Sequence, residues 1–175
     1  AAPDAYFSCD QSFLEMVGER FYPGTTVSSN RAVLLVRKGN PSKIEGLKDL
    51  CAPGLIVGLA HPEKSALGAL SVLLLEEAGL TESFEASGNL MLDSATGDFL
   101  VNQMRTGSLD AAIVYRSNAA EVMHELDLIE LGEDGASATQ PYAVARSSHH
   151  PKTLARLLDA LTEPESRARF HDYGF

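Results

Sequence analysis

The chain has 175 residues and a formal net charge of −10, with 45% hydrophobic and 22% charged residues. This composition is close to the globular average and excludes a disordered chain, while the length suits one domain or two small lobes. The acidity argues against nucleic acid or an anionic membrane as a partner, because both require a cationic surface, so any small anion must be held by local dipoles.

Apolar runs of strand length alternate with helical patterns along the chain. We expect strands at residues 5–7, 31–36, 55–59, 109–115 and 142–145. We expect helices at residues 11–17 and 44–50, after Pro62 up to Gly79, from Gly97 to Gly107, from Pro151, and from Pro164. Residues 132–137 read as a flexible loop. A run without polar alternation, as at 31–36, is typical of a strand buried on both faces, and the element order predicts an α/β fold with a mainly parallel sheet.

Catalytic signatures are missing from the sequence. None of the histidines forms a metal motif, and there is no nucleophile elbow, P-loop or dinucleotide fingerprint. We therefore predict a protein that is not an enzyme, with no catalytic residues, metal ligands or cofactor. Cys9 and Cys51 lack metal-ligand spacing; buried thiols are expected, and a disulfide remains an alternative.

Two junctions combine the end of a buried strand with the start of a helix, at residues 59–68 and 93–99. Each places free backbone N–H groups and the positive end of a helix dipole at the carboxyl edge of a sheet, where a small anion can bind. An ordinary capped helix start is the alternative. Tyr115 ends another buried strand, so its hydroxyl belongs at the same edge, unless it is simply a core tyrosine.

These features together resemble the periplasmic molybdate-binding proteins, which are type II solute-binding proteins of ABC transporters. The matching stretches keep the family's order: 3–11 (PDAYFSCDQ), 30–41 (NRAVLLVRKGNP), 61–63 (HPE) with Gly68, 113–115 (IVY), 142–144 (YAV) and 173–175 (YGF). The resemblance implies a type II periplasmic-binding-protein fold, in which two α/β lobes enclose an oxyanion held by neutral hydroxyl and N–H donors.

The resemblance implies which residues contact the oxyanion, because positions of this sequence can be matched to positions of the family. Leu67 and Gly97 would donate backbone N–H groups to the oxyanion, and Tyr115 would donate its hydroxyl. His61 and Gly68 are possible further contacts. His61 stands where the family usually has Asp, and it either donates to the anion or caps its own loop.

The resemblance also implies how the lobes are divided. Residues 32–141 would form the second lobe with the anion-binding loops, and residues 1–31 with 142–175 part of the first lobe. The family's chains start about 70 residues earlier, so the first lobe is expected to be incomplete, with exposed edges and apolar helix faces. A second chain supplying the missing elements is one possible partner, and weak or no binding is expected of these residues alone.

The function implied is that of an extracytoplasmic protein, periplasmic or at the cell surface, which binds a tetrahedral oxyanion. Molybdate or tungstate is the first choice and a sulfate-like anion the second, and the partner is the membrane permease of an ABC transporter. Two alternatives share the fold: a ligand-sensing effector domain of a transcription regulator, and a truncated interaction module without a ligand.

Overall fold

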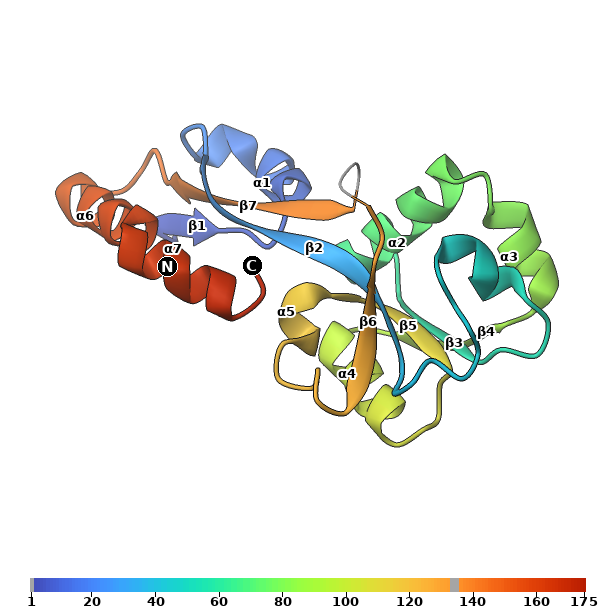
Figure 1. Cartoon of the computed structure of the whole chain (residues 1–175). Helices are drawn as coiled ribbons and strands as arrows, with labels where there is room; N and C mark the ends of the chain where they lie inside the picture. Colours follow the sequence, from blue (N-terminus) through green and yellow to red (C-terminus); the bar gives the residue numbers. More distant parts are fainter. Residues whose placement is uncertain (1, 133–135) are drawn as a thin grey trace. The chain divides into compact units, whose positions relative to one another are not determined.

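A computed structural model describes residues 2–132 and 136–175 of the chain. The chain divides into two compact units, unit 1 with residues 1–30 and 138–175 and unit 2 with residues 31–137 (Figure 1). Strands β2 (Thr25–Arg37) and β7 (Ser137–Val144) carry the chain from one unit to the other. Unit 1 is therefore built from both ends of the sequence, and unit 2 from its continuous middle.

Unit 2 contains a mixed sheet with the strand order β6-β2-β5-β3-β4. The other strands are β3 (Val57–Ala60), β4 (Leu90–Ser94), β5 (Ala111–Tyr115) and β6 (Leu126–Glu130). Strand β3 runs parallel to β4 and β5, whereas β2 is antiparallel to β5 and β6. The carboxyl ends of β3, β4 and β5 consequently meet at one edge of the sheet.

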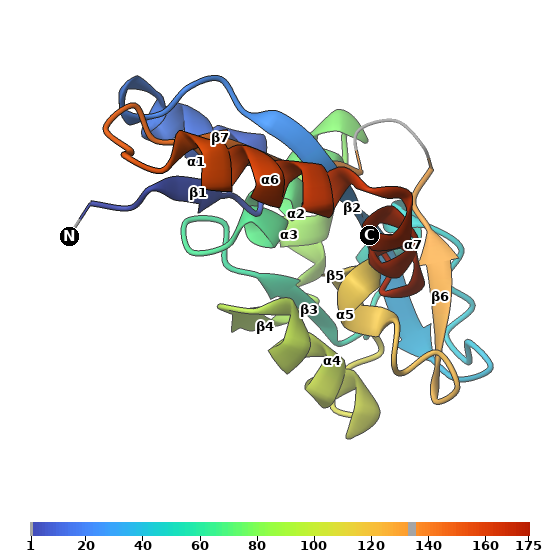
Figure 2. The same cartoon turned by 90° about the vertical axis from the view of Figure 1, so that its left-hand side faces the viewer.

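The apolar runs form the centre of this sheet, as expected. Residues 32–36 of β2 are at most 1% exposed, and residues 111–114 of β5 are fully buried. Helices α2 (Ala66–Glu77) and α4 (Gly97–Arg105) both pack against β3 and β5 (Figure 2). Side chains on both faces of these strands are thus removed from water, which explains why the strands lack polar alternation.

The remaining elements of unit 2 are short. They are η2 (Leu47–Cys51), α3 (Thr81–Ser87) and α5 (Arg116–Ala119). The short helix expected over residues 44–50 forms only as the 3₁₀ helix η2, which begins three residues later than expected. The Asn40 side chain binds both the N–H of Ile44 (3.0 Å) and its carbonyl (2.8 Å), which commits that backbone to a loop.

Unit 1 combines β1 (Ala5–Phe7), α1 (Gln11–Met16), η1 (Gly18–Arg20), α6 (Pro151–Thr162) and α7 (Pro164–Asp172) with β7. Strands β1 and β7 are antiparallel, with Ala5 opposite Val144. Asp10 caps α1 by accepting the N–H of Ser12 at 2.9 Å. Pro151 and Pro164 start their helices, as the sequence predicts.

The core of unit 1 is small and leaves apolar groups exposed. Its buried cluster consists of Leu14, Phe21, Ala143 and Ala145. Of the four leucines on one face of α6, only Leu154 is buried, and Leu157 is 45% exposed. Helix α6 thus has the amphipathic pattern of a core helix without burying most of its apolar face.

The two cysteines are free and lie in different units. The expectation of buried thiols is wrong for Cys9, which is exposed at the turn after β1, and Cys51 is half-buried. Of the loop expected at residues 132–137, residues 133–135 lie outside the described part of the chain. Within the described ranges, no helix combines the length and the apolar character that crossing a bilayer requires.

Tyr142 links β7 to α6 and generates a prediction on pH dependence. Its side chain is buried, and its hydroxyl donates to the carbonyl of Leu154 at 3.2 Å. Burial raises the pKa of Tyr142 above its ordinary value. Above pH ~10 the unfolded chain releases this proton while the folded chain retains it, so the contribution to stability is complete below that pH and declines above it.

We expect Tyr142→Phe to reduce the fall in the free energy of unfolding between pH 9 and 11, measured by urea denaturation. Tyr173→Phe, at an exposed tyrosine of the same unit, is the control. Equal slopes in both variants would show that burial of Tyr142 does not cause the pH dependence.

Candidate functional site

The loop between β3 and α2, residues 61–65, is organised by His61. Its N–H donates to the carbonyl of Ser94 at 2.7 Å, which ties the loop to the end of β4. Its carbonyl accepts the N–H groups of Lys64 and Ser65, and its ring Nδ1 accepts the N–H of Glu63 at 3.1 Å. Within the described chain, Ser65 makes no side-chain cap bond at the start of α2. The first-turn N–H groups of α2 therefore have neither intrahelical acceptors nor a side-chain cap.

The second ring nitrogen of His61 faces an acidic side chain. Nε2 lies 3.7 Å from Oδ2 of Asp93, and the His61 side chain is only 24% exposed. Because Nδ1 already accepts a bond from the loop, the contacts of the ring match a role in holding the loop. A direct bond from His61 to an anion stays a prediction.

Gly68 allows α2 to pack directly on this loop. A Cβ at residue 68 would lie 2.4 Å from the carbonyl carbon and oxygen of His61 and 2.6 Å from the carbonyl oxygen of Ala60. Backbone atoms of a strand end cannot move aside as a flexible side chain can. Gly68 thus fixes how closely the first turn of α2 approaches the end of β3, which is a packing role.

The start of α4 is built from short polar side chains. Ser94 Oγ bonds both the N–H and the carbonyl of Thr96, and Thr96 Oγ1 accepts the N–H of Phe99 at 3.3 Å. Gly97 is the first residue of the helix, so its N–H group lies among the donors for which the helix has no internal acceptor. This junction has the geometry that the sequence predicts, with a positive helix end at the carboxyl edge of the sheet.

Around Gly97, the structure brings together the three predicted site residues. A Cβ at residue 97 would lie 3.2 Å from Cδ2 of Leu67 and 2.4 Å from Oδ1 of Asn118. The same Oδ1 accepts the N–H of Tyr115 at 3.2 Å. Leu67, Gly97 and Tyr115, from three different elements, therefore form one cluster within unit 2, with Asn118 at its centre.

Sequence reasoning missed Asn118. It lies three residues after the end of β5, where Asn and Asp side chains commonly bond to nearby backbone. An Asn at this position could therefore have been predicted to bond to the end of the strand. Its Nδ2 donates to Oδ1 of Asp98 at 2.8 Å, which a sequence pattern does not reveal. The space that the missing side chain of Gly97 leaves is occupied by this amide.

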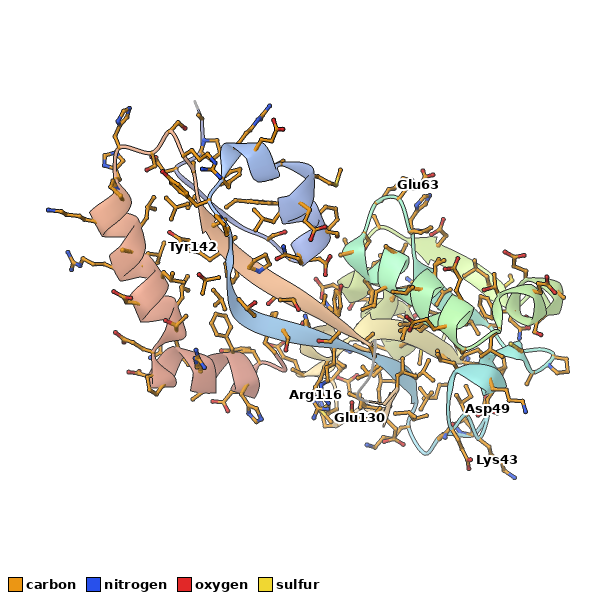
Figure 3. The ribbon with its side chains drawn as sticks, turned by 90° about the horizontal axis from the view of Figure 1, so that it is seen from above. Lys43, Asp49, Glu63, Arg116, Glu130 and Tyr142 are labelled. Atoms are coloured by element: carbon orange, nitrogen blue, oxygen red, sulfur yellow. The ribbon has the colours of Figure 1, made fainter. Side chains whose placement is uncertain are left out.

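Neutral groups dominate the cluster. Arg116, the nearest cation along the chain, is paired with Glu130 (Figure 3), and the Tyr115 hydroxyl oxygen is shielded from solvent. The described residues include no group of three or more His, Cys, Asp or Glu side chains arranged for a metal ion. The chemistry that the arrangement offers is donation from backbone N–H groups and one hydroxyl, which suits a small anion.

Known proteins similar to this chain include bacterial solute-binding proteins. The family model described as bacterial extracellular solute-binding protein matches residues 1–175. The molybdate-binding protein ModA of Mycobacterium bovis is 25% identical over 185 residues, covering 100% of this chain and 66% of the relative. The chain spans 60–66% of the length of the curated relatives that it matches.

Two solved structures show the same architecture. The periplasmic molybdate-binding protein of Azotobacter vinelandii superimposes with a TM-score of 0.80 at 15% identity, covering 99% of this chain and 78% of that one. The sulfate-binding protein SubI of Mycobacterium tuberculosis gives 0.79 at 16% identity, with 100% and 69% covered. These structural matches confirm the expected type II periplasmic-binding-protein fold. The family model and the sequence match to ModA confirm the resemblance to periplasmic molybdate-binding proteins.

The contact at residue 68 generates a prediction on stability. We expect Gly68→Ala to lower the free energy of unfolding by about 1–3 kcal/mol, because its methyl group would overlap rigid backbone. Gly46→Ala is the matched control, since nothing lies within 4 Å of a Cβ there, and its effect should stay within about 0.5 kcal/mol. Denaturant unfolding of both variants measures the difference, and equal effects would contradict the packing role of Gly68.

Proposed function

Because the chain belongs to the family of bacterial extracellular solute-binding proteins, we propose that it binds a tetrahedral oxyanion and delivers it to an ABC transporter. The observation that carries the proposal is the cluster around Gly97, where the starts of α2 and α4 meet the end of β5. In the proposed site, the N–H groups of Leu67 and Gly97 and the hydroxyl of Tyr115 donate to the anion, with Gly68 and His61 shaping the loop beside it.

The proposal is compatible with a net charge of −10. Long-range repulsion from surface carboxylates is screened within about 10 Å at ordinary salt, whereas an anion in contact with N–H groups is held at hydrogen-bonding distance. Helix N-termini also supply positive partial charge without a cationic side chain. Acidity therefore argues against extended polyanions but leaves a small, desolvated oxyanion as a possible ligand.

Molybdate or tungstate is the proposed first choice of ligand. The similar proteins described above include two named for molybdate and one named for sulfate. Both ligands are tetrahedral oxyanions of similar charge. Leu67, a buried leucine packed beside Gly97, would narrow the site relative to a smaller residue. The family consists of solute-binding proteins, which supports the expectation of a protein that is not an enzyme.

We also propose that the protein has the two lobes expected from the resemblance. One lobe consists of residues 32–141, and the other of residues 1–31 together with residues 142–175. The partly exposed leucine face of α6 supports the idea that the lobe made of residues 1–31 and 142–175 is completed by further elements, from the same gene product or from a second chain. The proposed location is periplasmic or at the cell surface, where the membrane permease of the transporter is the partner.

Titration calorimetry tests the proposal directly. Molybdate, tungstate, sulfate and phosphate are titrated into the 175-residue chain and into the longest natural gene product that contains it. Binding of one of them, with a matching rise in melting temperature, is expected for the longer gene product, and weak or no binding for the 175-residue chain. The absence of both signals for all four anions in both proteins would contradict the proposal.

The gene sequence upstream of these residues separates the transport function from the alternatives. A DNA-binding motif there would favour a transcription regulator, and a signal peptide would favour transport.

Tyr115→Phe tests the role of the hydroxyl. We expect the affinity for the anion to fall by about 0.5–1.5 kcal/mol, the usual contribution of one hydrogen bond, or more if the hydroxyl meets a charged oxygen. Tyr173→Phe, at an exposed tyrosine in unit 1, serves as the control and should leave the affinity unchanged. Wild-type affinity in Tyr115→Phe would remove this residue from the site.

A further inference from the structure

The Asn118 side chain contacts two parts of the cluster around Gly97, the end of β5 and the first turn of α4. Its Oδ1 accepts the N–H of Tyr115 at 3.2 Å, and its Nδ2 donates to Oδ1 of Asp98 at 2.8 Å. Its Oδ1 would also lie 2.4 Å from a Cβ at residue 97, so the amide rests directly on the Gly97 backbone. The end of β5 and the first turn of α4, about 20 residues apart in sequence, are thus held by a single amide.

The chemistry of the two partners requires a side chain that both accepts and donates a hydrogen bond, as an amide does. The Tyr115 N–H is a donor and needs an acceptor, whereas the Asp98 carboxylate is an acceptor and needs a donor. A carboxylate at residue 118 would meet only the first need, and an apolar side chain would meet neither. Since the two bonds fix which end of the amide is oxygen, they also fix the orientation of the side chain.

Asp98 makes this orientation relevant to an anion. Its carboxylate follows directly after Gly97, whose N–H is a proposed donor to the ligand, and a free carboxylate there would repel that ligand. The bond from Nδ2 holds the carboxylate at the amide of Asn118. The same side chain thus sets the spacing between Gly97 and Tyr115 and restrains the nearest negative charge on α4.

We propose that Asn118 is the positioning residue of the oxyanion site, acting through Gly97, Tyr115 and Asp98 without touching the ligand itself. This inference rests on the proposed function for its ligand. It adds to that function a residue that determines the geometry and the electrostatics of the site.

A charge exchange between residues 98 and 118 tests the proposal. Asn118→Asp retains the acceptor for the Tyr115 N–H but places two carboxylates in contact, and we expect the affinity for molybdate to fall about tenfold. The double variant Asp98→Asn/Asn118→Asp restores one donor and one acceptor with the wild-type net charge, and should recover the affinity to within about threefold. Asp98→Asn alone retains an acceptor for Nδ2 and removes the negative charge beside Gly97, so its affinity should exceed that of the wild type.

Asn102→Asp is the matched control. It adds the same charge at an exposed position of α4, one turn further along the helix, and should change the affinity by less than about twofold. Titrations are done at a temperature at which circular dichroism shows every variant to be folded. A purely structural role would lower the melting temperature of Asn118→Asp while leaving the affinity of the folded protein unchanged, and that outcome would overturn the proposal.

A measurement without ligand separates this inference from the proposed function. In Asn118→Ala the Tyr115 N–H loses its acceptor, so its hydrogen exchange, followed by NMR, should accelerate at least about tenfold while amides in the middle of β5 keep their rates. If the wild type binds molybdate but Asn118→Ala changes neither this rate nor the affinity, the inference alone is wrong. If the wild type binds no oxyanion, the proposed function and the positioning role fall together, even when the exchange rate responds.

Discussion

The first turn of α2 lies so close to the backbone at the end of β3 that residue 68 has no room for a methyl group. This approach decides where α2 begins relative to the carboxyl edge of the sheet. It also decides where Leu67 lies, and Leu67 in turn packs beside Gly97 at the start of α4. The bond from the His61 N–H to the Ser94 carbonyl fixes the same two junctions to each other. Two helix starts are thereby brought together by backbone contacts, which makes their spacing insensitive to most side-chain substitutions.

Such a site suits an anion in an acidic protein. Its donors are N–H groups, and its charged neighbours are already engaged, Arg116 with Glu130 and Asp98 with Asn118. A cationic side chain in the site would bind many anions tightly and without regard to shape. Fixed N–H and hydroxyl dipoles demand oxygens at defined positions, so geometry contributes more to selectivity than total charge does.

The two units differ in how complete their cores are. Unit 2 buries both faces of its central strands and contains every residue of the candidate site, so the geometry around Gly97 can be understood within unit 2 alone. Unit 1 buries a smaller cluster, and of the α6 leucine face it buries only Leu154 fully. An amphipathic helix gains stability only where its apolar face is covered, which makes unit 1 the part of the protein whose stability depends most on additional contacts.

Local pattern was enough to predict the buried strands at residues 31–36 and 109–115, the helices starting at Pro151 and Pro164, and the two junctions that position Leu67 and Gly97. Each rests on interactions between near neighbours in sequence, namely apolar continuity, proline geometry and helix capping. Strand β6 and helix α3 were not predicted, and of the helix expected at 44–50 only the 3₁₀ helix η2 over Leu47–Cys51 forms, after a loop held by Asn40. The role of Asn118 depended on folding, because its bond to Asp98 and its contact with Gly97 join segments that are adjacent only once β5 and α4 have packed together.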